Sequence, residues 1–348
     1  MYSMDKSGYK KILLNFNQQI EEAQDIYEKA NIKLDRQKIK NILYLGMGGS
    51  AIVGDLLFDV FFDELQIPLN VVRSYFAPSF CNENTLVIAS SYSGNTEETL
   101  SATAYAAETG AQVLTIASGG KLTAMAAEHN WNRISIPEGL PPRQALGYLF
   151  FPLYHLFGKY GLLKNYNENL QHLAKFVQET AQRNDYPGRE GKVLAKELAY
   201  TIQNKIPVFY STAPYLSTVS RRWQNQIQEN AKSLAFANIL PEMNHNEIVG
   251  WEIENIDLKN MIVIFLENLE AHPRIKKRIE LSKKIIKDRG VEVVDIYADG
   301  TCYMEKVFSL IVLGDWVSYY LALAYEKDPS EIKNIDFLKK EMEVLEEK

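Results

Sequence analysis

Residues 41–62 read NILYLGMGGSAIVGDLLFDVFF, a short apolar run followed by a glycine-rich turn and a longer apolar segment. The run Asn41–Leu45 has the length and composition of a buried strand, and Ala51–Phe62 has the length of a helix. A strand that passes through glycines into a helix is the first half of a β-α-β unit, which builds a parallel sheet with helices on its faces. The sequence therefore predicts an α/β fold.

The alternation of strands and helices continues along the chain. In the first half the predicted elements are the strands Leu69–Arg73, Thr85–Ser90 and Gln112–Ala117 and the helix Thr96–Thr109. In the second half they are the strands Ile206–Tyr210, Met261–Leu266 and Val291–Tyr297 and the helices Ser220–Lys232 and Pro273–Asp288. The runs GAQVLTI (110–116) and GVEVVDI (290–296) share one pattern. This repetition predicts two tandem doubly wound domains with parallel sheets.

The length of 348 residues suits two domains. We expect an N-terminal helical segment over residues 1–35, a first domain over 36–183 and a second over 192–348. Helix-like polar sequence at Asn15–Ala30 supports the N-terminal segment. The stretch Asn184–Gly191, which contains Pro187 and Gly188, has the composition of a domain boundary.

The overall composition excludes several classes of protein. Hydrophobic residues make up 46% and charged residues 24%, as in soluble globular proteins. The net charge of −6 argues against a nucleic-acid partner, because nucleic-acid affinity rests on neutralising phosphates. The two cysteines, Cys81 and Cys302, are far apart, so a disulfide scaffold or cysteine metal site is not expected.

The two segments that bear on location both favour a soluble protein. The N-terminus lacks the apolar core of a signal peptide. The apolar segment Val307–Tyr325 contains Gly314 and Asp315 and is rich in tyrosine, which favours a buried helix over a membrane span. We expect a cytoplasmic protein without membrane association.

The glycine turn over residues 46–50 is a candidate phosphate site. Backbone N–H groups and the positive end of a helix converge there, so Gly48, Gly49 and Ser50 could bind an anion. A tight turn without a ligand is the structural alternative. The turn also matches the dinucleotide fingerprint G-x-G-x-x-A, but the next strand ends in Arg73 rather than in an acidic residue. This weakens a dinucleotide site without excluding an NADP-type one.

A second loop, SSYSGNTEET at residues 90–99, follows the strand Thr85–Ser90 and precedes a helix. Open α/β sheets bind ligands at the carboxyl ends of their strands, which is where the hydroxyls of Ser91, Ser93 and Thr96 are expected. The alternative is that these side chains cap the helix, with Asn95 and Glu98 as a capping box. The corresponding sequence in the second half is ENLEAHPRIKKR, which lacks the run of hydroxyl side chains. A phosphate site is therefore predicted in the first domain only.

The motifs LGMGGSAIVGD and SSYSGNTEETL resemble those of the sugar isomerase (SIS) family. Four further stretches, in the same order, resemble the bifunctional phosphoglucose/phosphomannose isomerase branch: PEGLPPRQALGYLF, RRWQNQIQENAK, PEMNHNEIVGW and KDPSEIKNIDFLKK. The resemblance runs from about residue 41 to the C-terminus. It implies two SIS domains of flavodoxin-like topology, a homodimer, a sugar-phosphate substrate and neither a metal nor a nucleotide cofactor.

The resemblance also places a base and a positive charge. Glu229 corresponds to the family's catalytic base, and a carboxylate can remove a carbon-bound proton when it lies within reach. A solvated helix carboxylate is the alternative. Arg143 follows Pro141-Pro142, and its permanently charged guanidinium suits an enediolate or a phosphate. Its alternative is a surface-loop arginine.

Two further residues are expected to assist ring opening. His245 lies in a polar segment, and histidine is a side-chain type that can transfer protons in enzymes. In the family that the sequence resembles, this histidine reaches the active site of the neighbouring subunit. His155, by contrast, has the surroundings of a packed helix residue. The family also uses a lysine near the C-terminus, which Lys339 matches best, with Lys333 and Lys340 as the alternatives.

With the resemblance, these residues favour a cofactor-independent aldose–ketose isomerase that interconverts glucose 6-phosphate with fructose 6-phosphate through a cis-enediol, and mannose 6-phosphate is expected as a second aldose substrate. The first alternative is a non-catalytic sugar-phosphate regulator, which has no need of both Glu229 and His245. The second is an NADP-dependent oxidoreductase, which would bind a nicotinamide cofactor at the glycine turn.

Overall fold

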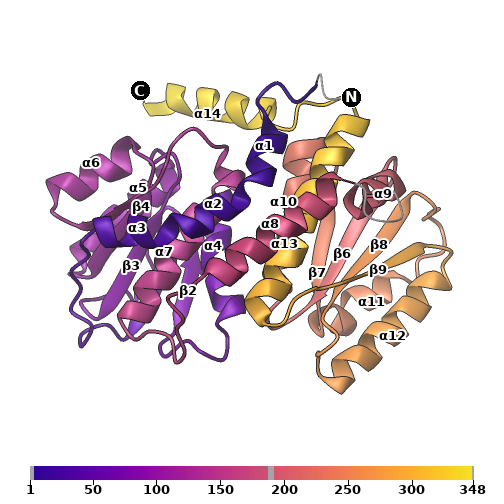
Figure 1. Cartoon of the computed structure of the whole chain (residues 1–348), viewed down its shortest axis with the longest axis horizontal. Coiled ribbons are helices and arrows are strands. Elements are labelled where there is room, and N and C mark those ends of the chain that lie inside the picture. The colour runs from indigo at the N-terminus through magenta and orange to yellow at the C-terminus, as the bar shows by residue number, and fades with distance from the viewer. Residues whose placement is uncertain (1–3, 187–191, 347–348) are drawn as a thin grey trace.

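The computed structural model describes residues 4–186 and 192–346, and within them the chain forms two parallel sheets (Figure 1). The first sheet has the strand order β2-β1-β3-β4-β5. Its strands are β1 (Asn41–Leu45), β2 (Leu69–Val72), β3 (Thr85–Ser90), β4 (Gln112–Ala117) and β5 (Asn132–Ser135). Every pairing in it is parallel.

The second sheet has the order β7-β6-β8-β9, again with parallel pairings throughout. Its strands are β6 (Ile206–Thr212), β7 (Phe236–Leu240), β8 (Met261–Glu267) and β9 (Glu292–Tyr297). In both sheets the second strand along the chain lies outside the first, and the third and fourth follow on its other side. The prediction of two tandem doubly wound sheets is therefore confirmed. The sequence did not reveal β5 and β7, which lie at sheet edges and are mostly incompletely buried.

The helices confirm the predicted alternation, with some shifted ends. The helices of the first half are α4 (Gly48–Val60), α5 (Glu97–Glu108), α6 (Gly120–Glu128) and α7 (Leu146–Lys159); those of the second half are α10 (Ser217–Ala231), α12 (Pro273–Lys287) and α13 (Tyr303–Ala324). The helix predicted from Ala51 begins three residues earlier, so the glycine turn forms its first turn. The strand predicted to Arg73 ends at Val72, and the Arg73 side chain pairs with Asp55.

The region predicted as an N-terminal helix is broken into short pieces. These are α1 (Tyr9–Leu14), α2 (Phe16–Glu21) and α3 (Ala23–Lys29), and α2 packs against α8 (Gln171–Asp185). Of the expected boundary, Asn184 and Asp185 end α8, whereas Pro187, Gly188 and Gly191 lie outside the described residues. Helix α9 (Leu194–Ile202) follows.

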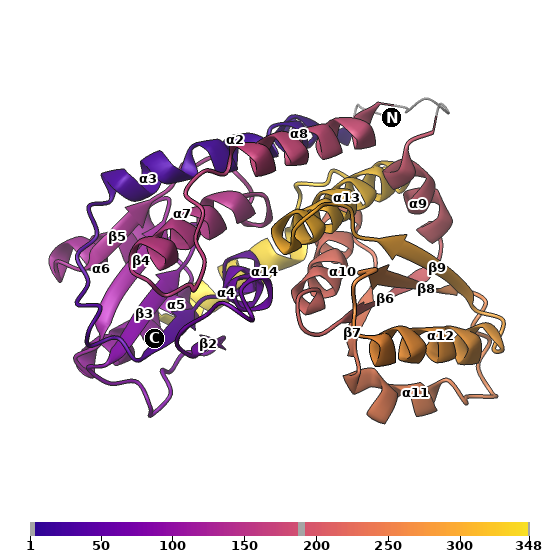
Figure 2. The same cartoon turned by 60° about the horizontal axis from the view of Figure 1, so that its bottom comes forward.

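Helix α13 is the central core helix, as its apolar sequence predicts. It packs against α8, α9 and α10 (Figure 2). Gly314 allows the closest approach, because a Cβ there would lie 2.4 Å from the indole nitrogen of Trp223. By length and composition α13 could cross a membrane, but 94% of its most apolar window is buried inside the protein.

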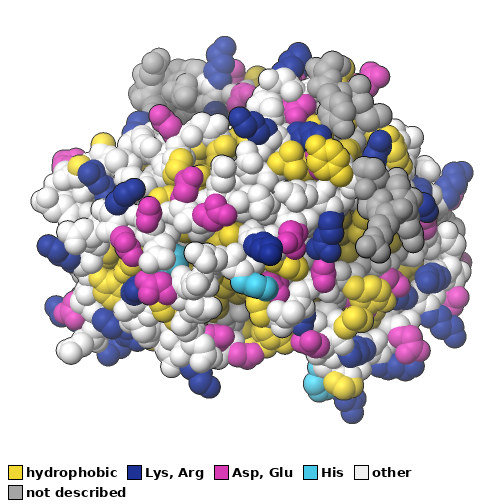
Figure 3. Space-filling model, viewed as in Figure 1, with side chains coloured by type: hydrophobic (Ala, Val, Ile, Leu, Met, Phe, Trp, Pro, Cys, Tyr) yellow, Lys and Arg dark blue, Asp and Glu magenta, His cyan; other side chains and the backbone are white. Residues whose placement is uncertain are grey.

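Three short or peripheral elements carry Arg143, His245 and Lys339, namely η2 (Pro142–Gln144), η3 (Glu242–His245) and α14 (Lys333–Glu346). Helix α11 (Glu247–Gly250) follows η3. Helix α14 extends along the top edge of the first half in Figure 1, away from the second sheet. The face shown in Figure 3 mixes Lys and Arg with Asp and Glu, without a block of positive charge.

Candidate active site

The glycine turn packs directly against Arg143. Gly48 has a φ of 49°, a left-handed conformation that glycine adopts without strain. A Cβ on Gly49 would lie 3.2 Å from the Cα of Arg143, tighter than ordinary contact, so a side chain there would press on η2. Ser50 is buried, and its hydroxyl accepts a hydrogen bond from the Tyr92 N–H at 3.1 Å. The turn is thereby joined to both Arg143 and the second loop.

The second loop lies at the carboxyl end of β3, as predicted. Ser91 is fully buried and its hydroxyl lies 2.9 Å from that of Thr96. Ser93 is exposed, and its oxygen accepts a hydrogen bond from the Asn95 N–H. Of the three hydroxyls, that of Ser93 is therefore the most accessible to a ligand, while Ser91 is held within the loop.

The structure does not contain the capping box that the sequence offered as an alternative. Thr96 is the N-cap of α5, and no side chain caps that helix. The Asn95 side chain instead accepts a hydrogen bond from the Lys121 N–H at 3.0 Å, across to α6. Helix capping therefore does not account for the hydroxyls of this loop.

Arg143 and Glu229 come together although they belong to different halves of the chain. The Arg143 guanidinium lies 3.3 Å from a carboxylate oxygen of Glu229. Only 3% of the arginine side chain is exposed, so it is not a surface-loop residue, whereas 28% of the glutamate is exposed and accessible to a ligand. Arg143 lies in η2, which follows β5, and Glu229 lies in the last turn of α10. Their contact therefore joins the segment after the first sheet to the end of α10.

Four acceptors and an aromatic ring surround the buried guanidinium. Besides Glu229, it donates to the Asn230 side-chain oxygen and the Pro329 carbonyl, each at 2.6 Å, and to the Ser330 carbonyl at 3.5 Å. The Tyr9 ring lies 5.8 Å from it, within cation–π range. Burial raises the pKa of Tyr9 to about 12, so this phenol stays neutral.

A second buried arginine, Arg222, is hydrogen-bonded to the backbone of Arg143. Arg222 donates to the backbone carbonyl of Arg143 at 3.0 Å and to the Asp315 carboxylate at 2.7 Å. Gln226 donates to the other oxygen of Asp315 at 2.7 Å. A buried charge needs a paired and hydrogen-bonded partner, and Arg222 and Asp315 supply one another with it. The Arg222 Nε and Gln226 Oε1 atoms are buried without a hydrogen-bond partner among the described residues.

His245 lies at the end of η3, exposed at the surface of the second half. Its neighbours are fixed: the Asn244 amide donates to Ser282 at 2.8 Å, and the Asn246 side chain accepts from the Glu247 N–H. Within the described part of the single chain, no hydrogen bond or ion pair joins His245 to Arg143 or Glu229. The structure therefore separates the predicted histidine from the predicted base in one subunit.

Lys339 lies exposed on α14 and likewise makes no hydrogen bond to Arg143 or Glu229 within the described residues. The segment before this helix does reach the site, because Pro329 accepts from Arg143. Lys333 is paired with Glu331 at 2.9 Å, while Lys340 is exposed beside Lys339. The choice of lysine stays a prediction.

Two contributors to the site were missed from the sequence, namely Asn230 and Lys232. They lie one and three residues after Glu229, in the motif QENAK that the family resemblance already quotes. The Lys232 amine donates to the backbone carbonyls of Asn230 at 3.0 Å and Asp328 at 2.5 Å. The motif itself was the available signal, but a sequence does not show which carbonyls a lysine reaches.

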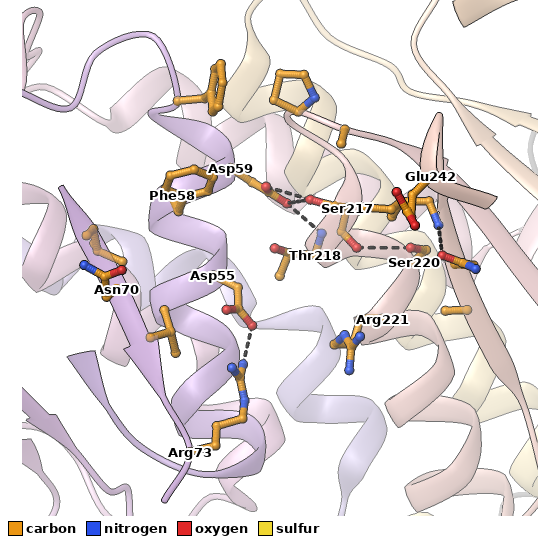
Figure 4. Close-up of a pocket in the computed structure, with 18 residues that line it drawn as sticks. Asp55, Phe58, Asp59, Asn70, Arg73, Ser217, Thr218, Ser220, Arg221 and Glu242 are labelled. Carbon is orange, nitrogen blue, oxygen red and sulfur yellow. Dashed lines mark hydrogen bonds and ion pairs between the residues drawn. The ribbon is translucent and has the colours of Figure 1, made fainter. Parts of the chain in front are cut away.

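A cavity of about 830 Å³ opens between α4 and β2 on one side and α10 and β7 on the other (Figure 4). None of the predicted site residues lines it. Asp59 lies at its edge, and its carboxylate accepts from the Ser217 hydroxyl at 2.7 Å and the Thr218 N–H at 2.6 Å. Arg73, which the dinucleotide hypothesis would need for a 2′-phosphate, is paired with Asp55 there.

The comparisons with known proteins extend over nearly the whole chain. Residues 192–342 match the family model described as the bacterial phospho-glucose isomerase C-terminal SIS domain. A bifunctional phosphoglucose/phosphomannose isomerase of Caldicellulosiruptor bescii is 40% identical over 94% of this chain and 97% of its own length. One from Aquifex aeolicus is 36% identical, over 91% and 94%.

Solved structures show the same fold at lower identity. A hypothetical protein of Thermus thermophilus superposes with a TM-score of 0.75 at 16% identity, covering 97% of this chain and 90% of its own. Tagatose-6-phosphate ketose/aldose isomerase from Escherichia coli gives 0.67 at 13% identity, covering 94% and 96%. These likenesses concern the fold alone.

Proposed function

Because the chain belongs to the bifunctional phosphoglucose/phosphomannose isomerase family, we propose that it interconverts glucose 6-phosphate and mannose 6-phosphate with fructose 6-phosphate. The observation that carries this proposal is the pairing of Arg143 with Glu229 beside the glycine turn. It combines a carboxylate, a fixed positive charge and a candidate phosphate cradle at one edge of the first sheet.

The reaction needs a proton to move between two carbons. Glu229 removes the proton from carbon 2 of the open-chain aldose, and the electron pair forms the carbon 1–carbon 2 double bond of an enediolate. A proton then passes from the carbon 2 hydroxyl to oxygen 1, and the Glu229 carboxylic acid returns its proton to carbon 1, which leaves a hydroxyl at carbon 1 and the ketone at carbon 2. Arg143 stabilises the negative oxygen, and its fixed hydrogen bonds mean that little reorganisation is needed when charge develops.

The phosphate is assigned to the two loops that open α4 and α5. Gly48, Gly49 and Ser50 offer the N-terminal N–H groups of a helix, and Ser91, Ser93 and Thr96 offer hydroxyls. Because Ser91 is buried in the structure, we assign it to holding Thr96 in place rather than to the first contact with phosphate.

Ring opening is assigned to His245 and Lys339, which lie away from Glu229 within one chain. The exposed position of His245 is compatible with a homodimer in which this histidine enters the partner's site. Such an enzyme would be active only as a dimer. A cytoplasmic location remains a prediction.

The test is a coupled assay of the purified protein at high concentration in the presence of EDTA. We expect fructose 6-phosphate from both aldose phosphates. Sugar-phosphate binding without turnover would instead favour the non-catalytic regulator, and thermal protection by NADPH but not by fructose 6-phosphate would favour the oxidoreductase.

Substituting Glu229→Gln should lower kcat by roughly 10²-fold or more, the scale of general-base catalysis, while sugar-phosphate binding persists. Glu108→Gln, at an exposed helix end, is the matched control and should leave kcat unchanged. Turnover of Glu229→Gln close to the wild-type rate would remove Glu229 from the mechanism.

A further inference from the structure

Lys232 occupies an unusual position at the end of α10. It is the C-cap of the helix and has a φ of 55°, a left-handed conformation that non-glycine residues seldom adopt. It lies three residues after Glu229 and is partly exposed, and its amine nevertheless donates to two backbone carbonyls beside the site.

The two carbonyls belong to the two stretches that anchor Arg143. One is the carbonyl of Asn230, whose side chain accepts from the arginine at 2.6 Å. The other is the carbonyl of Asp328, the residue before Pro329, whose own carbonyl also accepts from the arginine at 2.6 Å. Lys232 therefore bridges the acceptors of Arg143 without touching the guanidinium.

The segment Asp328–Ser330 links the core helix α13 to α14. Hydrogen bonds from Arg143, from Lys232 and between Ser7 and Ser330 tie it to the rest of the protein. The Asp328 side chain also accepts from the Ser330 N–H at 2.8 Å, which closes a tight turn. The direction in which this segment leaves the site also sets where α14 begins.

We propose that Lys232 is a positioning residue for the isomerase site, because its amine clamps the Asp328–Ser330 segment to the end of α10 and so fixes the Pro329 carbonyl that orients Arg143. This inference rests on the proposed function. In this proposal Lys232 acts on catalysis indirectly, by holding Arg143 and the start of α14 in position. It makes no contact with the substrate.

Several charged groups face the amine. Glu229 lies on the same helix, Arg143 comes from η2, and Asp328 and Glu331 come from the C-terminal segment. Burial, and then the charge of Arg143, lower the pKa of Lys232 to about 8. An ammonium makes stronger hydrogen bonds to carbonyls than a neutral amine does, so the clamp should weaken as the pH rises above this value.

The experiment compares Lys232→Met, Lys232→Arg and the control Lys327→Met, which removes an exposed lysine near the same segment. Methionine keeps an unbranched stem but removes the donor. We expect Lys232→Met to lower kcat for glucose 6-phosphate by about tenfold to a hundredfold, the usual effect of a misplaced catalytic group, with KM changed much less. Lys232→Arg should restore most of kcat, and Lys327→Met should match the wild type.

The pH profile gives a readout that a merely structural role would not move. The wild-type kcat should fall above about pH 8, and this alkaline decline should vanish in Lys232→Arg, because a guanidinium stays charged. An unchanged kcat in folded Lys232→Met, or an identical alkaline decline in Lys232→Arg, would overturn the proposal.

Hydrogen exchange by mass spectrometry tests the clamp without relying on activity. Peptides covering residues 326–335 should exchange faster in Lys232→Met than in the wild type, while peptides from the first sheet stay unchanged. Equal exchange in this segment contradicts the proposal even if the wild-type protein proves inactive as an isomerase. Inactive wild-type protein with faster exchange in the variant would instead refute the proposed function alone.

Discussion

At the scale of single residues, Arg143 shows how a permanent charge can be buried beside a reacting centre. Its side chain is 3% exposed, yet it has two acceptors at 2.6 Å and a carboxylate at 3.3 Å. The planar guanidinium can donate to several acceptors at once, and a lysine ammonium at this position would satisfy these acceptors less well. The long contact with Glu229 leaves the carboxylate partly exposed, as a base that must reach a substrate requires.

His155 provides a residue-scale prediction about stability. It is buried, as its sequence context predicts, and its ring nitrogen lies 2.8 Å from the Tyr166 hydroxyl. Burial lowers the pKa of His155 to about 4. The unfolded chain therefore binds a proton more readily than the folded protein, and the free energy of unfolding should fall as the pH drops below about 6.5.

Substituting His155→Phe removes this titration. Relative to the variant, the wild type should lose about 1.4 kcal/mol of stability per pH unit over the range from roughly pH 6 to pH 4. Chemical denaturation at several pH values measures it, with the exposed His129→Phe as the control. Parallel stability curves for wild type and His155→Phe would show that His155 does not titrate in this way.

At the scale of elements, the two sheets are alike but their corresponding helices begin differently. Helix α4 follows β1 as α10 follows β6. The start of α4 is the glycine turn, with no side-chain cap, whereas the Thr218 N–H at the start of α10 donates to the Asp59 carboxylate. A carboxylate from the first half thus occupies the anion position of the second. Because the N–H group at the start of α10 is already engaged, this difference supports assigning the phosphate to the first half.

Asp59 should therefore contribute to the interface between α4 and α10. Asp59→Ala removes a helix cap and the acceptor of Ser217 and should lower the free energy of unfolding by about 1–3 kcal/mol. Denaturation at pH 7 measures it, with the exposed Asp288→Asn as the control. A loss no larger than that of the control would contradict a capping role.

Burial raises the pKa of Asp59, which adds a pH dependence to this interaction. The folded protein binds the Asp59 proton more tightly than the unfolded chain does, so ionisation of this carboxyl opposes folding. Relative to Asp59→Asn, the wild type should thus lose stability as the pH rises from the ordinary aspartate pKa through the raised value. If the difference in the free energy of unfolding between the wild type and Asp59→Asn stays constant with pH, this titration is ruled out.

In the whole molecule, the predicted histidine and the C-terminal helix α14 are exposed and make no hydrogen bond to the Arg143–Glu229 pair within the described residues of one chain. Arg143 and Glu229 meet where the two halves face each other, whereas His245 is exposed on η3 and α14 carries exposed Phe337 and Leu338. An exposed histidine and exposed apolar side chains are both compatible with contact to a second subunit. The homodimer that we propose would use these surfaces.

Mixed dimers test whether His245 acts across the interface. Glu229→Gln and His245→Ala subunits are each inactive alone in our proposal. If the histidine enters the partner's site, random mixing should restore about a quarter of wild-type activity, because half of the dimers are mixed and each contains one intact site. Subunits are mixed under dissociating conditions, reassociated and assayed. No recovery in verified mixed dimers would place the histidine in the site of its own chain.

Sequence patterns were sufficient to predict the alternation of strands and helices, the glycine turn, the buried character of α13 and the tandem repetition. These features depend on short-range properties, namely the spacing of apolar residues and the backbone freedom of glycine. The family motifs further identified Glu229 and Arg143. Sequence did not predict β5, β7 or the broken N-terminal helices, because short edge strands and helix breaks give weak local signals.

Which of these residues contact one another is seen only in the tertiary structure. Arg143 and Glu229 are 86 residues apart in the chain, and Asp59 and Thr218 are 159 apart. Whether such residues touch depends on how the halves pack and not on any local pattern. Burial likewise encloses the Arg143 guanidinium, which the sequence alone could equally place on a surface loop, and a desolvated donor must find its acceptors within the protein.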